Sequence, residues 1–313
     1  MKNILITGGA GFIGSMLCTE LVKNKNFNII VLDILKYEKN SLNHLMSQKN
    51  FFFHNVNILD KKKLLPFIKK ADLIIPLAAL VGAPLCEKNK KLAIETNEKI
   101  IQFTLKNLKK KQKIIYPTTN SGYGIGAKNK YCDENSPLNP VSLYGVTKNK
   151  AEKLISSHEN SICFRLATVF GFSFRMRTDL LVNNLVKESL NKKKLTLFEP
   201  HFRRNFVHIS DVVKAIIFAI KNFNSLKKGK VYNLGLSTAN LTKLQLAKKI
   251  NKYIPIKINV DTKTKDPDKR DYFVSNDKIE KKGFKCTRSL DDGIIELSKI
   301  YKINNYETIK NNY

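Results

Sequence analysis

The sequence predicts an α/β fold, with a doubly wound parallel sheet and a smaller C-terminal domain. One observation is the alternation of helix-like segments with apolar strand-like segments at 3–7, 27–32, 51–56, 73–79, 113–118 and 162–170. Such alternation indicates parallel strands, because a helix must return the chain before the next parallel strand begins. The other is a glycine-rich turn directly between the first strand and an amphipathic stretch. The 313 residues are enough for two domains.

That turn carries glycines at GxxGxxG spacing, namely Gly8, Gly11 and Gly14, with Phe12 and Ile13 between the last two. Glycines let the backbone bend tightly and let a pyrophosphate approach the helix N-terminus, where N–H groups and the helix dipole favour anions. A strand, this turn and a helix in that order predict a dinucleotide site of the Rossmann type.

The second strand supports the same interpretation, because it ends at Asp33, 19 residues beyond Gly14. At a spacing of about 20 residues an acidic side chain meets the ribose hydroxyls of NAD. An acid there repels a 2′-phosphate, so we expect NAD rather than NADP, a preference that Lys36 and Lys39 would weaken. We expect an NAD-binding Rossmann domain over residues 1–171 and a smaller second domain over 172–313, with part of 206–235 returning to the first.

Composition raises one competing class, because the formal net charge is +30. Nucleic-acid binders are often this basic, but they read bases and phosphates chiefly with arginine. Only seven of the 56 basic residues are arginine, and the lysines are spread along the chain. We interpret the charge as solvated surface and expect no nucleic-acid partner.

Cysteine content and hydropathy bound the cellular setting. Five cysteines without a CxxC pair predict reduced thiols, no metal site and a cytoplasmic protein. The longest apolar stretch, 73–85, contains Pro76, Gly82 and Pro84 and is too short to span a bilayer. The N-terminus lacks a charged leader and cleavage site, so we expect neither a signal peptide nor a membrane partner.

The few arginines are informative in a chain that otherwise uses lysine. All seven lie in the second half, and apart from Arg288 they are Arg165, Arg175, Arg177, Arg203, Arg204 and Arg270. A planar fork of donors suits phosphate oxygens, so several are candidates for binding a second phosphorylated ligand. Arg165 lies inside an apolar strand, where a structural ion pair explains it equally well.

A catalytic pair is predicted where Tyr144 and Lys148 open a helix after a proline-rich segment. Residues four apart share a helix face, so the phenol and the ammonium point the same way. A free tyrosine has a pKa of about 10. The lysine and a positive nicotinamide ring would lower the pKa of Tyr144 toward neutrality, which suits a general base. The fifth strand ends at Thr119, and small Ala78 and Ala79 after the fourth would let a cofactor lie close to the backbone.

These motifs together resemble the extended short-chain dehydrogenase/reductases that act on nucleotide sugars, the epimerase and dehydratase group. The resemblance covers nearly the whole chain and rests on TGGAGFIGS at 7–15, LAAL at 77–80, PTTNSGYG at 117–124, SLYGVTK at 142–148, RLATVFG at 165–171, RRNFVHISDV at 203–212 and DPDKRDY at 266–272.

The resemblance implies a role for each matching position. The glycines would bind the pyrophosphate, Asp33 the adenosine ribose, Asn57 and Ile58 the adenine, and Leu77, Ala78 and Ala79 further parts of NAD. Thr119, Tyr144 and Lys148 would form the catalytic trio. The residues expected at the sugar nucleotide are Asn120, Ser121, Thr168, Arg175, Arg177, Arg204 and Arg270, of which Arg204 and Arg270 match arginines that bind its diphosphate.

The departures from the family pattern bear on the reaction. Dehydratases of the group usually place Asp-Glu directly after the catalytic threonine, whereas this chain has Asn120-Ser121. Dehydration is therefore disfavoured, which leaves 4-epimerisation, net oxidation at C4, or a binding protein without catalysis. The motifs LAALVGAP at 77–84 and FRMRTDLLVN at 174–183 are similar to those of a bacterial surface-polysaccharide subgroup. That subgroup includes C4 dehydrogenases of GDP-linked heptose. The favoured hypothesis is NAD-dependent C4 oxidation of a nucleotide-activated sugar.

Relatives often dimerise through two helices, which correspond here to about 92–109 and 144–158. The first carries more apolar residues than one core-facing stripe requires, namely Leu92, Ile94, Ile100, Ile101, Phe103, Leu105 and Leu108. We therefore expect a homodimer.

Overall fold

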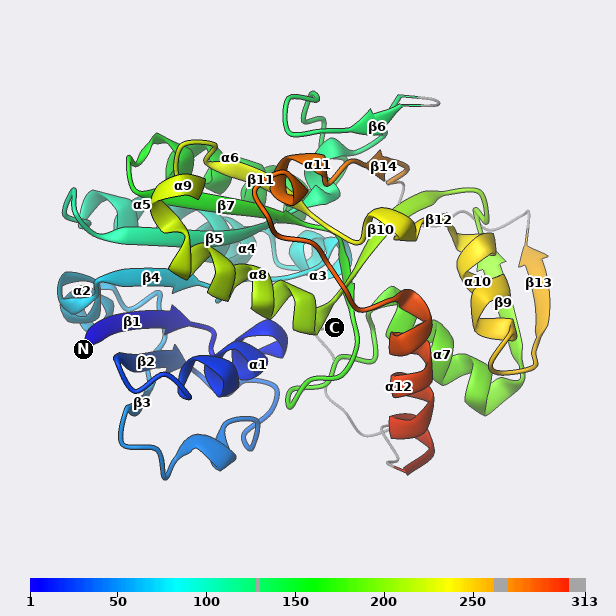
Figure 1. Cartoon of the computed structure of the whole chain (residues 1–313), viewed down its shortest axis with the longest axis horizontal. Helices are drawn as coiled ribbons and strands as arrows, with labels where there is room; N and C mark the ends of the chain where they lie inside the picture. The colour runs from blue at the N-terminus through cyan, green and yellow to red at the C-terminus, as the bar shows by residue number, and fades with distance from the viewer. Residues whose placement is uncertain (128–129, 262–269, 304–313) are drawn as a thin grey trace.

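A computed structural model describes residues 1–127, 130–261 and 270–303. Its centre is a seven-stranded sheet with the order β11-β7-β5-β4-β1-β2-β3, in which every neighbouring pair is parallel (Figure 1). The strands are β1 (Lys2–Thr7), β2 (Phe27–Asp33), β3 (Phe51–Asn55), β4 (Leu73–Pro76), β5 (Lys113–Thr119), β7 (Ser161–Leu166) and β11 (Val231–Leu234). The predicted doubly wound parallel sheet is confirmed.

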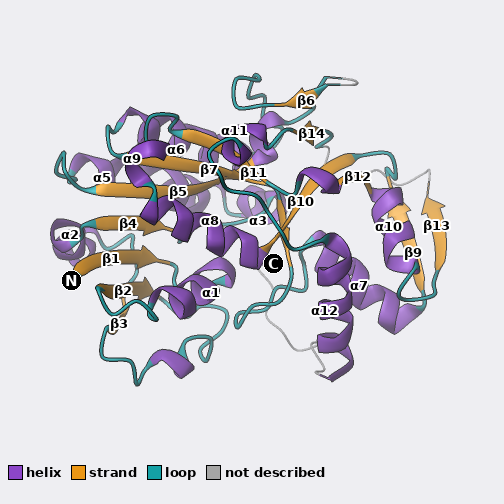
Figure 2. Ribbon diagram, in the orientation of Figure 1, coloured by secondary structure: helices purple, strands orange, loops and turns teal. Residues whose placement is uncertain are grey.

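Helices cover both faces of this sheet, as alternation along the strands requires (Figure 2). Ile4 and Ile6 of β1 pack into one core with α1 (Phe12–Leu21) and α8 (Ile209–Lys221), which is followed by α9 (Phe223–Leu226). Leu5, between them, packs into a second core on the opposite face. That face is covered by α2 (Lys61–Lys70), α5 (Ile100–Lys106) and α6 (Leu143–Ser157).

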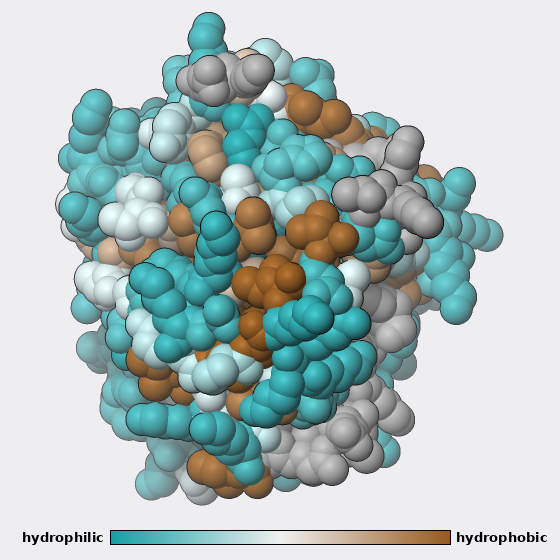
Figure 3. Space-filling view, turned by 90° about the vertical axis from the view of Figure 1, so that its right-hand side faces the viewer, coloured by the Kyte–Doolittle hydropathy of each residue, from teal (hydrophilic) through white to brown (hydrophobic). Residues whose placement is uncertain are grey.

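The remaining elements form smaller layers beyond the carboxyl edge of the sheet (Figure 1). Three small sheets pair β8 (Thr168–Phe170) with β10 (Arg203–His208) and β12 (Asn240–Thr242), β9 (Lys194–Phe198) with β13 (Lys257–Asp261), and β6 (Tyr131–Cys132) with β14 (Phe273–Val274). The helices here are α7 (Leu181–Lys192), α10 (Lys243–Asn251), α11 (Asp277–Glu280) and α12 (Leu290–Ile303). Hydrophilic side chains cover most of the face over α7, α10 and α12 (Figure 3).

One predicted strand is wrong in its extent. The segment 162–170 is not a single strand, because the chain leaves the large sheet at Ala167. The Ala167 N–H still donates to the Leu234 carbonyl at 2.9 Å, but β8 then pairs with β10 in another sheet. The strand expected over 73–79 also ends early, at Pro76, because the N–H groups of Leu77 and Ala78 both donate to the Thr7 carbonyl.

The helical segment expected at 92–109 is interrupted. It consists of α4 (Lys90–Ile94), a π-helical turn (Glu95–Lys99) and α5, and it follows α3 (Ala83–Lys88). Ile100 and Ile101 are buried within the chain itself, whereas Leu92 is exposed. The apolar surface left for another protein is thus smaller than the sequence predicted. In the part of the chain that the structure describes, no helix has the length and hydropathy to cross a membrane.

Candidate active site

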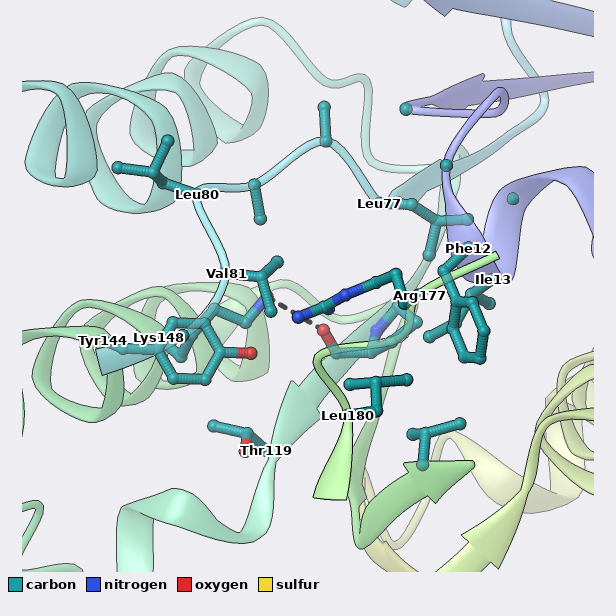
Figure 4. A pocket seen from close by; sticks show the side chains of 18 of the residues that line it. Phe12, Ile13, Leu77, Leu80, Val81, Thr119, Tyr144, Lys148, Arg177 and Leu180 are labelled. Carbon is teal, nitrogen blue, oxygen red and sulfur yellow. Dashed lines mark hydrogen bonds between the residues drawn. The ribbon is translucent and has the colours of Figure 1, made fainter. Parts of the chain in front are cut away.

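A cavity of about 710 Å³ opens at the carboxyl edge of the large sheet and is closed by segments from the second half of the chain. All the predicted cofactor residues line it, from the glycine turn through Asp33, Asn57, Ile58 and 77–79 to Tyr144 and Lys148. In Figure 4 Thr119, Tyr144 and Lys148 lie on one side, Phe12, Ile13 and Leu77 on the other, and Arg177 lies between the two groups.

The glycine turn is shaped by the absence of side chains. A Cβ on Gly8, whose φ is +74°, would lie 2.5 Å from the Ala78 nitrogen, and one on Gly14 would lie 2.4 Å from the Gly8 oxygen. A Cβ on Gly11 would meet only the Gly8 oxygen, at 3.1 Å, and Gly11 lines the cavity. No side chain caps the N-terminus of α1, which begins directly after Gly11. The turn therefore fits a dinucleotide pyrophosphate.

Asp33 ends β2 with its carboxylate fixed by backbone donors. The N–H of Ala10 donates to Oδ2 at 3.0 Å and that of Leu35 to Oδ1 at 2.8 Å. Burial raises the pKa of Asp33, although these backbone hydrogen bonds act in the opposite direction. Asn57 and Ile58 line the cavity together with their neighbours Val56 and Leu59, as expected for an adenine site.

The predicted catalytic trio comes from two elements. Thr119 ends β5, and its hydroxyl donates to the Ser121 hydroxyl at 2.9 Å and favours the ionised form of Tyr144. Ser142 caps α6 by accepting a hydrogen bond from the Gly145 N–H, which fixes the helix start that carries the phenol. The Lys148 ammonium donates to the Pro117 carbonyl at 2.9 Å and lies 3.9 Å from the ring centroid of Tyr116.

The ionisation of this trio differs from the sequence prediction in the cofactor-free protein. Burial raises the pKa of Tyr144 to about 12, with Arg177 and Arg270 acting in the opposite direction. Burial also lowers the pKa of Lys148 to about 7. The lysine is thus only partly charged at neutral pH, so it does not offset the cost of ionising a phenol away from water. The predicted lowering of the tyrosine pKa includes the effect of the nicotinamide ring and stays a prediction.

Two arginines lie near the phenol. Arg177 forms a two-point ion pair with Asp179, in which Nε donates to Oδ1 at 3.1 Å and Nη2 donates to Oδ2. Arg270 donates to the Ser121 hydroxyl, and its charge favours the ionised form of Tyr144. Both therefore place positive charge beside the reacting group.

The other arginines divide between the cavity and the scaffold. Arg204 is 2% exposed, lines the cavity and donates to the carbonyls of Arg203 and Arg270. Arg203 is bound to Asp271 and lies outside the cavity lining. Arg165 forms a buried ion pair with Glu152 at 2.7 Å, so the structural alternative for this residue is correct.

Among the residues predicted at the substrate, Ser121, Thr168, Arg175, Arg177, Arg204 and Arg270 line the cavity. Asn120 is not among the residues that line the cavity, and its assignment to the substrate stays a prediction. It is 1% exposed and begins the 3₁₀ turn Asn120–Tyr123 that follows β5. Residues 266–269 of the DPDKRDY motif lie outside the described residues.

Several lining residues were not predicted: Tyr37, Asp179, Lys243 and Tyr272. Asp179 follows Arg177 by two residues, a spacing that could have suggested an ion pair. Lys243 carries no distinguishing signal in a lysine-rich chain.

The fold and this cavity define a dinucleotide-dependent enzyme with a tyrosine–lysine pair at its reacting end. The chain belongs to the NAD dependent epimerase/dehydratase family, whose profile matches residues 4–235. The predictions of an enzyme, of NAD as its cofactor and of the epimerase/dehydratase group are confirmed.

Individual relatives agree with this assignment. The chain is 33% identical over 254 residues to an uncharacterized UDP-glucose epimerase of Bacillus subtilis, covering 74% of this chain and 76% of that protein. It is 33% identical over 273 residues to a dTDP-D-glucose 4,6-dehydratase of Dictyostelium discoideum, covering 80% of this chain and 62% of that protein. A solved UDP-glucuronic acid 4-epimerase from Bacillus cereus, in complex with UDP-glucuronic acid and NAD, superposes with a TM-score of 0.83 at 26% identity. That superposition covers 96% of this chain and 100% of the other.

Proposed function

We propose that the protein oxidises the C4 hydroxyl of a nucleotide-activated sugar with NAD, and that the substrate is a GDP-linked heptose used in bacterial surface-polysaccharide biosynthesis. The observation that carries the reaction is the trio Thr119, Tyr144 and Lys148 in one cavity, with no elimination pair beside it. The heptose rests on the resemblance of the motifs at 77–84, 119–126, 174–183 and 266–272 to that subgroup.

The residues perform the first half of the reaction as follows. Tyr144 takes the proton of the C4 hydroxyl while the hydrogen on C4 leaves as hydride, which produces a ketone. The chemistry that bound NAD supplies is acceptance of this hydride. Thr119 lines the same cavity as the phenol and favours its ionised form, so it is placed to hold the substrate oxygen beside the base. Arg177 and Arg270 stabilise the phenolate by their positive charge.

Elimination of water needs a further acid and base, and the described residues that line the cavity offer none near the phenol. Its carboxylates, among the described residues, are Asp33, Glu38 and Asp179. Asp33 ends β2 at the cofactor end, and Arg177 binds both oxygens of Asp179. The Arg177 bond lowers the pKa of Asp179 although burial raises it, so this carboxylate is a poor proton acceptor.

Arg204 and Arg270 support a diphosphate-linked substrate, because a guanidinium group can donate two parallel hydrogen bonds to phosphate oxygens. Both line the cavity, and the Arg204 guanidinium donates to the Arg270 carbonyl. The two side chains thus come from neighbouring backbone, although 66 residues separate them in sequence.

A 4-epimerase is the second candidate, favoured by the likeness to the epimerases of B. subtilis and B. cereus. An epimerase begins with the same oxidation. The keto sugar then rotates in the cavity and takes the hydride back on its other face. Tyr144 would return the proton in that case.

The deciding experiment incubates the protein with NAD and a panel of GDP- and UDP-sugars, with detection of NADH by absorbance and of products by mass spectrometry. We expect a product lighter by two hydrogens together with NADH. An isomer of unchanged mass without net NADH makes the protein an epimerase, and loss of water contradicts both proposals.

The matched control is Tyr144→Phe, which should lower turnover by about 10²- to 10⁴-fold, the usual contribution of a general base. Its affinity for NAD should stay unchanged. Wild-type protein that binds NAD and every sugar nucleotide without turnover would be a binding protein.

We also propose a cytoplasmic homodimer that pairs α6 and the segment from α4 to α5, with the domain division at 171/172. Leu92 on α4 is exposed and supports such a contact. The pairing of β11 with β7 supports the return of part of 206–235 to the first domain. Light scattering should give twice the chain mass, and Leu92→Glu should reduce it to that of one chain.

A further inference from the structure

The segment 172–180, which we call the strap, leads from β8 to α7 but returns to the cofactor end of the cavity. The Ser173 hydroxyl donates to the Phe12 carbonyl at 2.7 Å and hydrogen-bonds the Ser15 hydroxyl at 3.0 Å. Both partners belong to the first turn of α1, beside the glycines. Next along the strap, the Phe174 ring stacks on His44 at a centroid distance of 4.1 Å. The strap therefore contacts the dinucleotide half of the molecule.

Both ends of the strap are held. The Phe172 N–H donates to a Glu296 carboxylate oxygen at 3.2 Å, and Asn183 donates to the Arg177 carbonyl at 2.9 Å. These bonds fix the backbone on either side of Arg175.

Arg175 points toward the adenosine end of the cavity. It lines the cavity, is 3% exposed, and its guanidinium carbon lies 4.6 Å from the ring centroid of Tyr37. Its charge favours the ionised form of Asp33. Burial and the neighbouring Arg177 lower the pKa of Arg175 to about 10, which leaves it charged at neutral pH.

Arg177, two residues further along the strap, acts at the end of the cavity where Tyr144 lies. It is bound to Asp179, and its charge favours the ionised form of Tyr144. The two arginines of one short segment thus serve opposite ends of the cavity, although both were predicted to bind the substrate.

We propose that Arg175 is a cofactor-binding residue, whose guanidinium would donate to the adenosine ribose and diphosphate of NAD. The turn and Asp33 supply backbone donors and a carboxylate, but no positive side chain. A diphosphate carries negative charge that a guanidinium fork neutralises and orients. Tyr37 holds the guanidinium plane in place by stacking.

The test measures binding of ADP-ribose and of NAD by calorimetry, without any sugar, so its outcome does not depend on the reaction proposed above. Arg175→Ala should weaken both ligands by about ten- to a hundred-fold, the loss of hydrogen bonds from a charged group. Arg175→Lys should recover only part of the affinity, because lysine keeps the charge and loses the planar fork. Lys39→Ala is the matched control, since Lys39 is an exposed cation of the segment after β2 outside the cavity lining, and it should bind as wild type.

A second measurement protects the test against a variant that fails to fold. Tyr37→Leu should weaken ADP-ribose binding by itself, and the double variant with Arg175→Lys should lose less than the sum of the two single losses. Wild-type affinity of Arg175→Ala for ADP-ribose, with a raised KM for the sugar nucleotide, would assign Arg175 to the substrate and overturn the proposal. So would additive losses in the double variant.

Discussion

The two ends of the cavity are built differently. The cofactor end is made mostly of backbone from short contiguous segments, the glycine turn and the ends of β2 and β4. The reacting and sugar end is made of side chains from distant segments: Thr119, Tyr144, Arg177, Arg204 and Arg270. A site made of backbone is sensitive to any added atom, whereas a site made of side chains is sensitive to the loss of charge. The following variants test that difference.

The largest effect is expected at the sugar end, from Arg270→Ala. This change removes the donor to Ser121 and a cation near Tyr144. We expect the KM for the sugar nucleotide to rise by about ten- to a hundred-fold, the loss of hydrogen bonds from a charged group. Steady-state kinetics measures this, and calorimetry should find unchanged NAD affinity. Weakened NAD binding with an unchanged KM would mean that the two ends are not separable in this way.

Glycine variants test the cofactor end. In Gly14→Ala the new Cβ would overlap the Gly8 carbonyl, so we expect about 1–3 kcal/mol lower free energy of unfolding. In Gly11→Ala the atom nearest the new Cβ is the Gly8 oxygen at 3.1 Å, a tight contact rather than an overlap, so the free energy of unfolding should fall by less than in Gly14→Ala. NAD affinity should nevertheless fall in Gly11→Ala, because the methyl group enters the cavity. Urea unfolding without cofactor and calorimetry measure the two quantities, and equal destabilisation by both variants would contradict the packing argument.

The smallest effect, counted per pH unit, is a pH dependence at the catalytic lysine. Burial lowers the pKa of Lys148 from 10.5 to about 7 in the folded chain, so between these values the unfolded chain binds more protons. The free energy of unfolding should therefore rise with pH through this window, by up to about 1.4 kcal/mol per pH unit, and this contribution is lost as pH falls toward 7. Lys148→Met should remove that part of the slope. Urea unfolding of both proteins at pH values across the window decides, and identical slopes would show that Lys148 keeps an ordinary pKa.

The difference between the two ends also explains what the sequence could predict. The glycine turn, Asp33 and the sheet follow from local spacing and alternation, because each depends on neighbours in the chain. The break of one predicted strand into β7 and β8 depends instead on pairing with β10, some 38 residues away in register. No pattern among neighbouring residues in the sequence predicts such a pairing.

Residue roles show the same limit. Tyr144 and Lys148 share a helix face, so four-residue spacing was enough to place them together. Arg175 and Arg177 also have a regular spacing, but their opposite destinations depend on Tyr37 and Asp179, which tertiary packing brings to them. Asn120 lies next to Thr119 in sequence, but it begins the 3₁₀ turn after β5 and is outside the cavity lining.

All five cysteines are buried, and burial raises the pKa of each thiol. Thiolates are the species that react with alkylating dyes. The native cysteines should therefore not react with a thiol label, so none of them has to be removed. Phe174 is 40% exposed in the middle of the strap. A single Phe174→Cys substitution would create one addressable thiol, whose attached fluorophore would report nucleotide binding beside the strap.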